Sequence, residues 1–287
     1  MASESFTPAL HPVPPSGDER WSVSIVTYHP ERATIARTLA YLLEACRAWQ
    51  MERGGEIELY LVDNGGLPDL AEPIAALERA GVACTRISGH GNVGYGRGHN
   101  LAIERARSRC HLVLNPDVDL DRDTLVRAAE FLDAHPQVGL LAPRTYDGER
   151  RLQYLCRRYP TLLDLFVRGF LPGSLRKRFA RRLARYEMRD RINDTDIVWE
   201  PPIVSGCFML FRTELLRRLE GFDPRYFLYF EDYDLSVRAG RLASIAYVPS
   251  VRIVHHGGGA SRKGFAHIRM FLASAFRFYR RFGWKWL

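Results

Sequence analysis

The stretch Leu112–Leu120 (LVLNPDVDL) is an apolar run that ends abruptly in polar residues. Its first three residues favour a buried strand, and Pro116 stops that strand because proline has no N–H to donate. If the backbone stays extended after Pro116, Asp117 and Asp119 project to the same side, because side chains alternate along a strand. Two carboxylates at this spacing predict a site for Mg²⁺ or Mn²⁺, which could bridge the phosphates of a nucleotide. The alternative is a surface turn, in which Asn, Pro and Asp are ordinary residues.

Strands and helices alternate in the residues that precede this stretch. We expect strands at 22–27, 56–62 and 82–88, and helices at 34–48, 70–80 and 100–108. This alternation predicts βαβ units and an α/β fold with a mostly parallel, Rossmann-like sheet flanked by helices. In such sheets ligands bind beyond the carboxyl ends of the strands. Thr27 and Asp63 each follow a strand, so we expect them to join the acidic stretch in the floor of one cleft, although each alone could be a turn residue.

The second half of the chain continues the sheet. Here we expect strands at 138–143, 204–211, 245–248 and 251–254, and short helices at 213–219 and 235–239. The chain has 287 residues, of which 46% are hydrophobic, so it can bury a substantial core. We expect a flexible, proline-rich leader over residues 1–20, one large domain over 21–262 and a C-terminal basic amphipathic helix over 263–287.

The composition of the chain indicates where the protein is located and what kind of partner it binds. No apolar run approaches the roughly 20 residues that span a bilayer, and the N-terminus does not resemble a signal peptide, so we expect a cytoplasmic protein. The five cysteines lack C-x-x-C spacing, which predicts reduced thiols. The net charge of +8 indicates an anionic partner. Arg and Lys cluster at residues 168–191 and in the last twenty residues, and neither cluster resembles a nucleic-acid module. The segments 170–186 and 268–287 fit basic amphipathic helices at a membrane surface or, alternatively, ordinary surface helices.

A glycine-rich segment at 89–100 (GHGNVGYGRGHN) contains the pattern G-x-G-x-x-G, ending at Gly94. A dinucleotide fingerprint should follow the first strand, whereas two strand-helix units precede this segment, so an oxidoreductase is disfavoured. We expect a loop that lets the backbone approach a donor molecule, with Asn92 and Asn100 offering amide hydrogen bonds. A plain flexible loop that enters a helix at Asn100 is the alternative.

A second acidic group follows the aromatic residues at 226–230. Glu231, Asp232 and Asp234 precede a short helical pattern. An acid in an aromatic, partly dry site can act as the general base on an acceptor hydroxyl. The alternative is a set of helix N-terminal acids stabilised by the helix dipole. Both can hold if Asp232 faces the cleft and Asp234 caps the helix.

Together these segments resemble the family 2 glycosyltransferases of the GT-A fold, and most closely their rhamnosyltransferase-like branch. The resemblance spans residues 21–261 and rests on six ordered motifs: SVSIVTYHP at 22–30, LVDNGG at 61–66, NVGYGRGHNLA at 92–102, NPDVD at 115–119, FEDYDLSVR at 230–238 and HHGGGAS at 255–261. One departure is that many members carry Arg directly before the Asn that opens the helix, whereas this chain has His99 there and Arg97 two residues earlier.

The resemblance implies roles for individual residues. It places Thr27 and Asp63 beside the nucleotide base, and it makes Asp117 and Asp119 the metal and diphosphate motif. It implies that Asp232, paired with Glu231, is the catalytic base. It also favours donor contacts at Asn92, Gly94 and Asn100, and it favours His255, at a strand end, as a third metal ligand.

The resemblance also implies a reaction. We expect an inverting, metal-dependent transfer of a sugar from a nucleotide-diphosphate donor, dTDP-rhamnose, to a hydroxyl of a cell-surface polysaccharide or lipopolysaccharide precursor. A glycan or lipid-linked acceptor and a basic helical region on the acceptor side would place the enzyme at the periphery of the inner membrane. The alternatives are a nucleotide-binding module without turnover and a dinucleotide-dependent oxidoreductase. The two acidic groups favour turnover, because binding alone needs no base.

Overall fold

A computed structural model describes residues 20–257 and 264–287. The expected leader and the last residues of the His255 motif lie outside the described residues. A ten-stranded sheet runs through the molecule in the order β3-β2-β1-β4-β11-β6-β12-β5, with β7 added to β6 and β9 added to β12. A separate two-stranded ribbon pairs β8 with β10. The mostly parallel, helix-flanked sheet predicted from the sequence is confirmed.

The N-terminal half forms the parallel part of the sheet. Its elements are β1 (Trp21–Thr27), α1 (Arg32–Arg53), β2 (Ile57–Asp63), α2 (Ala71–Arg79), β3 (Ala83–Ile87), α3 (Tyr95–Ile103) and β4 (Cys110–Leu114). β1 pairs in parallel with both β2 and β4, and Thr27 lies opposite Asp63 at the carboxyl ends of their strands. The polar strand ends therefore lie along one edge of the sheet, as the strand-helix alternation predicted.

The C-terminal half of the chain contributes both parallel and antiparallel strands to the sheet. Its strands are β5 (Val118–Leu120), β6 (Val138–Tyr146), β7 (Leu152–Gln153), β8 (Cys156–Arg157), β9 (Val198–Trp199), β10 (Ile203–Val204), β11 (Phe208–Arg212) and β12 (Ser244–His255). Its helices are α4 (Thr124–Ala134), α5 (Leu162–Phe170), α6 (Gly173–Arg176), the 3₁₀ turn η1 (Lys177–Phe179), α7 (Ala180–Tyr186), α8 (Thr213–Arg218), α9 (Glu231–Ala239) and α10 (Phe265–Phe282). β11 is antiparallel to both of its neighbours, β4 and β6.

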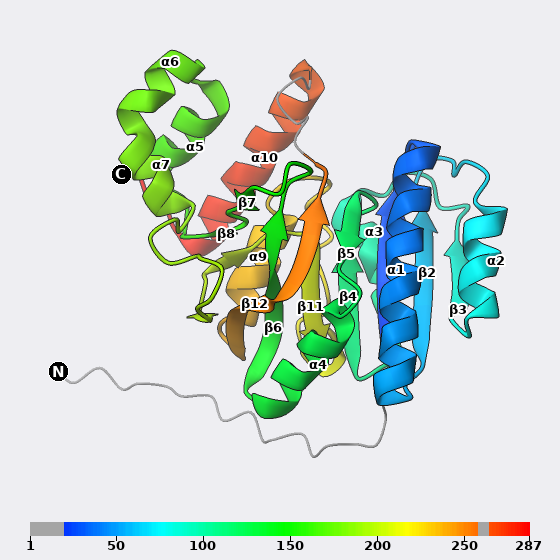
Figure 1. The fold of residues 1–287 in the computed structure, drawn as a ribbon. Coiled ribbons are helices and arrows are strands. Elements are labelled where there is room, and N and C mark those ends of the chain that lie inside the picture. Colours follow the sequence, from blue (N-terminus) through cyan, green and yellow to red (C-terminus); the bar gives the residue numbers. More distant parts are fainter. Residues whose placement is uncertain (1–19, 258–263) are drawn as a thin grey trace.

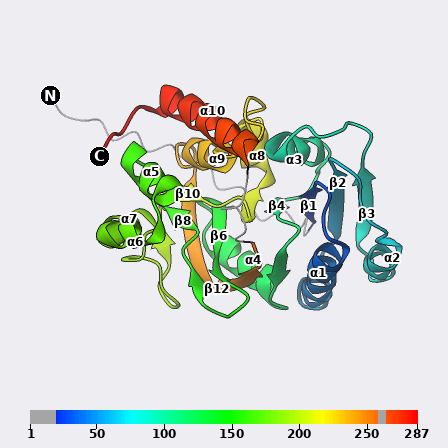
Figure 2. The same cartoon turned by 90° about the horizontal axis from the view of Figure 1, so that it is seen from above.

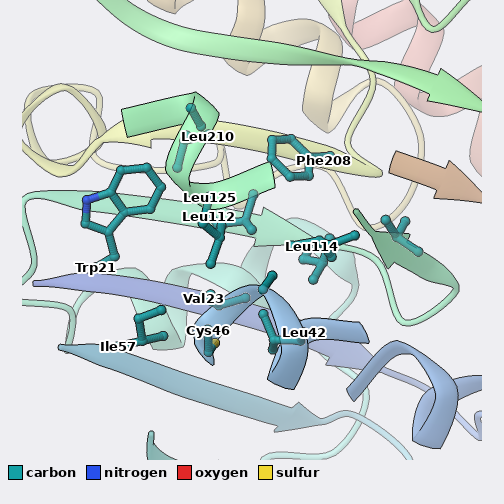
Figure 3. Close-up of a cluster of buried hydrophobic side chains, with 14 of the residues drawn as sticks. Trp21, Val23, Leu42, Cys46, Ile57, Leu112, Leu114, Leu125, Phe208 and Leu210 are labelled. Carbon is teal, nitrogen blue, oxygen red and sulfur yellow. The ribbon is translucent and has the colours of Figure 1, made fainter. Parts of the chain in front are cut away.

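Helices cover both faces of the sheet (Figures 1 and 2). α1, α2 and α4 lie on one face, while α3, α8, α9 and α10 lie on the other (Figure 2). On the first face Trp21, Leu112 and Phe208 pack with Leu42 and Cys46 of α1 (Figure 3). These side chains are almost fully buried, so the hydrophobic core holds β1, β4 and β11 in fixed register beneath the strand ends.

The glycine-rich segment is helical earlier than its sequence indicated. α3 begins at Tyr95, five residues before the expected start at Asn100. Gly96 and Gly98 lie inside this helix, where an added Cβ would come within 2.9 Å of Phe222 and 2.8 Å of Val26. These glycines therefore serve close packing of the helix on its neighbours rather than a loop, and composition alone could not distinguish the two.

Three other expected elements differ in continuity. The helix expected at 170–186 is broken at Leu171, which is extended because Pro172 follows it. The strand expected at 204–211 is divided into β10 and β11 around Gly206. The two strands expected at 245–248 and 251–254 form one strand, β12, with a register shift between Val248 and Arg252. Pro249 lies within that shift and has no N–H for the ladder.

Candidate active site

The acidic stretch meets the end of β12. Residues 116–117 form a turn, so the period-two argument for the two aspartates does not apply, although Asp119 lies in β5. His255 lies opposite Val118 in the antiparallel pairing of β12 with β5. The backbone N–H of His256 donates to the carbonyl of Asp117 at 3.0 Å. This pairing brings two histidines to two aspartates that are distant in sequence.

Asp119 is buried, and one of its two carboxylate oxygens has two polar partners. Its Oδ2 accepts from Nε of Arg37 at 2.9 Å and forms an ion pair with the same guanidinium. Nε2 of His256 lies 2.8 Å from this oxygen. Oδ1 of Asp119 is also buried and has no hydrogen-bond partner in the described part of the chain. The sequence analysis missed Arg37, because an arginine within a long helix carries no motif, and it favoured His255 over the adjacent His256.

Asp117 faces His255 rather than His256. Nε2 of His255 lies 3.5 Å from Oδ1 of Asp117, and that oxygen is buried without a hydrogen-bond partner among residues 20–257 and 264–287. A Cβ added at Gly257 would come within 2.5 Å of His255 and 2.8 Å of Asp117. Any other residue at 257 would thus fill the space between the imidazole and the carboxylate.

A small cavity of about 140 Å³ opens at this end of the sheet. Its lining residues are Ala33, Thr34, Arg37, Thr38, Asp117, Asp119 and His256. No cluster of three or more His, Cys, Asp or Glu side chains in the described residues is arranged to hold a metal ion. The donor chemistry nonetheless fits a hard divalent ion, because two buried carboxylate oxygens have no hydrogen-bond partner within residues 20–257 and 264–287. Mg²⁺ commonly uses one or two carboxylates together with substrate phosphates.

Asp63 and Thr27 are fixed at the ends of β2 and β1. Oδ1 of Asp63 accepts from the backbone N–H groups of Gly65 and Gly66, and Oδ2 accepts from Arg86 at 2.7 Å. Burial alone would raise the pKa of Asp63, but Arg86 and the two N–H groups outweigh burial and lower it. The hydroxyl of Thr27 donates to the carbonyl of Val62. Asp63 is therefore held as a carboxylate beside the edge of the sheet.

Gly94 joins the glycine-rich segment to the loop before α9. It has a φ of 90°, and an added Cβ would lie 2.3 Å from the carbonyl oxygen of Phe227. Asn92 accepts from the Gly94 N–H at 3.1 Å, so its side chain shapes the turn into α3. The N–H of Tyr95 donates to the Phe227 carbonyl at 3.1 Å. Only glycine permits this approach of two backbones.

Two neighbouring residues of α3 have structural partners. The amide of Asn100 donates to the carbonyl of Phe222 at 2.7 Å and accepts from its N–H at 2.8 Å. His99 is fully buried, and its Nδ1 lies 2.7 Å from the hydroxyl of Ser24. The position where many family members carry Arg is thus part of the core here, and the Asn100 amide is used to hold the loop before α9.

The second acidic pair begins α9 after a strained turn. Tyr229 and Phe230 have φ values of 69° and 65°, which are genuine outliers for bulky residues. Such strain costs of order 1–3 kcal/mol per residue and clusters at functional sites. The turn leads into the first turn of α9, which begins with Glu231 and Asp232.

Asp232 is tied to the backbone of the segment between β10 and β11. Its Oδ2 accepts from the N–H of Gly206 at 3.0 Å. Burial raises the pKa of Asp232, although the Gly206 bond opposes the shift. Burial, followed by the charge of Asp232, raises the pKa of Glu231. Two acids whose pKa values are both raised by a dry environment are suited to proton transfer.

Tyr95 connects the two acidic groups. Its hydroxyl donates to the Gly206 carbonyl at 2.6 Å. Burial raises the pKa of Tyr95 most, followed by the charge of Glu231, and Asp232 and Asp117 add to the rise. Its ring therefore lies within electrostatic reach of both acidic groups.

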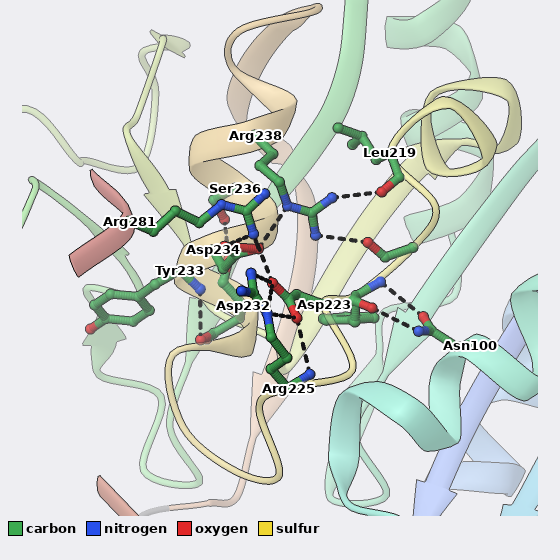
Figure 4. A network of polar contacts seen from close by, with 12 residues as sticks. Asn100, Leu219, Asp223, Arg225, Asp232, Tyr233, Asp234, Ser236, Arg238 and Arg281 are labelled. Atoms are coloured by element: carbon green, nitrogen blue, oxygen red, sulfur yellow. Dashed lines mark hydrogen bonds and ion pairs between the residues drawn. The ribbon is translucent and has the colours of Figure 1, made fainter. Parts of the chain in front are cut away.

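Asp234 does not cap α9, contrary to the sequence-based expectation. It is fully buried, and Oδ1 accepts from Nε of Arg238 at 2.7 Å. Oδ2 accepts from Arg281 of α10 at 2.9 Å (Figure 4). Arg281 also reaches Asp223, which accepts from Arg225 as well. This network of acids and arginines fixes α9 to the C-terminal helix.

The fold is that of the GT-A glycosyltransferases. The chain resembles GalNAc-T7, solved with UDP, GalNAc and Mn²⁺, with a TM-score of 0.61 and 15% identity over 91% of this chain and 47% of that chain. It also resembles the mannosyltransferase PcManGT from Pyrobaculum calidifontis, solved with GDP-Man and Mn²⁺, with a TM-score of 0.57 and 20% identity over 92% of this chain and 65% of that one. At these identities the likeness establishes the fold alone.

The protein belongs to glycosyl transferase family 2, whose family model matches residues 22–220. It is 29% identical over 206 residues to the rhamnosyltransferase WbbL of Escherichia coli K12, across 68% of this chain and 73% of that protein. It is 27% identical over 212 residues to the N-acetylglucosaminyl-diphospho-decaprenol L-rhamnosyltransferase of Mycobacterium tuberculosis, across 70% of this chain and 66% of that protein. The chain is a transferase of the rhamnosyltransferase-like kind, and it spans about two thirds to three quarters of these relatives.

Proposed function

We propose that this enzyme transfers L-rhamnose, with inversion, from dTDP-rhamnose to a hydroxyl of a lipid-linked glycan precursor. Both relatives are rhamnosyltransferases by name, which supports rhamnose, and the name of one of them includes a diphospho-decaprenol acceptor. The observation that carries the proposal is the half-buried Asp232, whose pKa is raised and whose carboxylate accepts from Gly206. The next residue, Cys207, accepts a hydrogen bond from Asn115 at the start of the acidic stretch. A binding module would not need such a base.

The donor would lie across the strand ends. In our proposal Thr27 and Asp63 lie beside the nucleotide base, while Asn92 and Gly94 shape the loop that covers the donor. Asn100 was expected among these contacts, but both ends of its amide are bonded to Phe222, so we assign it the positioning of the loop before α9.

A divalent ion, Mg²⁺ or Mn²⁺, would be held by Asp117 and Asp119, with His255 beside Asp117. Such an ion offsets negative charge on a leaving diphosphate. Solved neighbours that contain Mn²⁺ support this assignment of the cofactor. The groups available for it are Oδ1 of Asp117 and Oδ1 of Asp119, which accept no hydrogen bond from the described residues.

The protein's own acids would then complete the transfer. Asp232 accepts the proton of the acceptor hydroxyl as the oxygen attacks the anomeric carbon. The bond from that carbon to the leaving diphosphate breaks on the opposite face, so a single displacement inverts the configuration. Glu231 shares the dry site, where burial and the negative charge of Asp232 raise the pKa of Glu231. The one proton of the pair would therefore rest on Glu231 near neutral pH, which leaves Asp232 as the carboxylate that acts as the base.

A donor panel tests this proposal. The purified enzyme is incubated with Mn²⁺, an N-acetylglucosaminyl-diphospho-lipid and, in separate reactions, dTDP-rhamnose, UDP-GlcNAc, UDP-galactose or GDP-mannose. We expect nucleoside diphosphate release and glycolipid product with dTDP-rhamnose only. Transfer from another donor would overturn the sugar assignment, and donor binding without any product would favour a binding module.

A further inference from the structure

Helix α10 carries an uncovered apolar stripe. Phe265, Ile268, Leu272 and Phe276 are 81%, 39%, 54% and 56% exposed. They follow one another at helical spacings of three or four residues, so they lie on one side of the helix, which we call the outer stripe. An exposed stripe of four large apolar side chains is costly in water unless a partner covers it.

The opposite side of α10 is already packed. Phe278 and Tyr279 are fully buried in a cluster with Tyr226 and Phe230 of the segment before α9. Ser274 donates to the carbonyl of Leu228, and Arg281 reaches Asp234. The helix is thus held against α9 at the edge of the fold (Figures 1 and 2). The side of α10 that packs on the protein is already occupied, and the outer stripe lies on a different side of the helix.

A basic cavity of about 480 Å³ adjoins the outer stripe. Its lining residues are Arg225, Ala273, Phe276, Arg277, Arg280 and Arg281. Arg225 and Arg281 are paired with Asp223, whereas Arg280 has no hydrogen-bond or ion-pair partner among the described residues. Arg277 makes a cation-π contact with Tyr226 at 5.5 Å. The cavity therefore keeps positive charge available for an anion.

Charge, shape and aromatic content together point to one occupant. Phe276 belongs to both the outer stripe and the cavity, so apolar and cationic surfaces are continuous. Trp284 and Trp286 follow the helix and are exposed, as amphipathic rings at a lipid interface are. A second copy of α10 would instead oppose arginine to arginine. No helix in the described residues is both long and apolar enough to cross a membrane.

We propose that the outer stripe of α10 inserts into an anionic phospholipid surface while the arginine cavity holds a lipid phosphate. The arginine fork is suited to phosphate, and buried apolar area adds to electrostatic attraction in such binding. The segment 170–186, which the sequence also predicted to be basic and amphipathic, is divided into the short elements α6, η1 and α7 instead of one long helix. The inference rests on the proposed function only in that a lipid-linked acceptor would lie at the same surface.

Sedimentation of the full chain with vesicles tests the proposal. We expect binding to phosphatidylglycerol vesicles that weakens with salt, and little binding to phosphatidylcholine. The double variant Arg277→Gln/Arg280→Gln should lose roughly 30-fold in affinity, since each basic group near the surface contributes about a factor of five. Ile268→Ser/Leu272→Ser should weaken binding by a similar factor without a change in charge.

Arg178→Gln/Arg181→Gln is the matched control, because it removes two exposed arginines outside the cavity. It should bind vesicles within about twofold of the wild type; an equal loss in this control would overturn the site on α10. Equal binding to both lipids, or full displacement by inorganic phosphate at constant ionic strength, would also overturn it. The affinity for dTDP-rhamnose, measured by calorimetry without vesicles, should be unchanged in all variants. A wrong sugar assignment and a wrong membrane site would therefore give different results.

Discussion

The carboxylate of Asp232 and the backbone N–H of Gly206 are hydrogen-bonded at 3.0 Å. Gly206 is followed by Cys207, whose carbonyl accepts from the N–H of Asn115 at 2.9 Å. The base at the start of α9 is thereby linked to Asn115, which opens the acidic stretch, by one side-chain-to-backbone and one backbone-to-backbone hydrogen bond. Base and acidic edge would keep their separation as a donor binds.

Replacement of Asp232 tests its role as the base. Asp232→Asn should lower kcat by about 10²- to 10⁴-fold, the usual contribution of a general base, because an amide cannot accept the proton. Calorimetry should show that dTDP-rhamnose binding is retained. Glu214→Gln, an equivalent change at an exposed helix position, serves as the control. Lost donor affinity with residual turnover intact would assign Asp232 to binding.

The pH profile should show the raised pKa of Asp232. The active form is the carboxylate, so activity is present above its pKa in the folded enzyme and is lost as the pH falls through that value. Since burial raises this pKa, the acid limb of kcat/KM should lie above pH 3.9, the value of an unperturbed aspartate. The measurement uses a donor and an acceptor whose own groups do not titrate in this pH range. An acid limb of kcat/KM with a pKa at or below that of a free aspartate would contradict Asp232 as the base.

Asp119 should be required for the divalent ion. Asp119→Ala should weaken Mn²⁺ binding in the presence of dTDP and abolish transfer, because it removes one of two carboxylates. Arg37→Ala is a useful comparison, since it removes one of the two partners of Oδ2 of Asp119 and leaves both carboxylates in place. We expect it to keep Mn²⁺ binding by calorimetry. Unchanged Mn²⁺ affinity in Asp119→Ala would refute the assignment.

Acid should destabilise the fold through a buried histidine. Nδ1 and Nε2 of His111 lie 2.7 Å and 2.8 Å from the hydroxyls of Ser22 and Ser24, and burial lowers the pKa of His111 to about 3. The unfolded chain then binds more protons below about pH 6.5, so this stability is present above pH 6.5 and is lost as the pH falls toward 3. The loss should reach about 2 kcal/mol by pH 5.

Urea unfolding of wild type and His111→Gln at pH 8 and pH 5 isolates this contribution. The variant removes one titrating group and keeps a side chain that can bond both serines. The difference in unfolding free energy between the two pH values should be smaller in the variant. An identical difference would show that acid sensitivity arises elsewhere.

The sequence was informative where a strand of apolar residues met residues that break strands. Thr27, Asp63 and the acidic stretch could be placed at one edge because parallel strands align their ends. Arg37 and His256 could not be placed there, because their contact with Asp119 depends on a helix and on the pairing of β12 with β5. The roles of the donor and metal residues remain predictions, since the fold locates them but does not test them.

The start of α3 and the capping role of Asp234 were predicted wrongly for a related reason. Glycines in α3 look like a loop in composition, and only Phe222 and Val26, brought close by the fold, explain their small size. Asp234 has the residue type and the position of a capping acid, but Arg281 comes from a helix 47 residues later in the chain. Long-range partners decide such positions, and local pattern does not contain them.

The left-handed backbone at Tyr229 and Phe230 sets a limit on engineering this enzyme. A glycine at position 229 would adopt the same φ without steric cost, but it would lose the packing of the Tyr229 ring on Phe271 and the contact of the Tyr229 hydroxyl with His267 at 3.0 Å. The same change would let the turn sample other conformations and would loosen the aim of the two acids that follow. Relief of backbone strain at this turn is therefore tied to a loss of packing on α10 and to a less well placed base, so a search for more stable variants should leave position 229 unchanged.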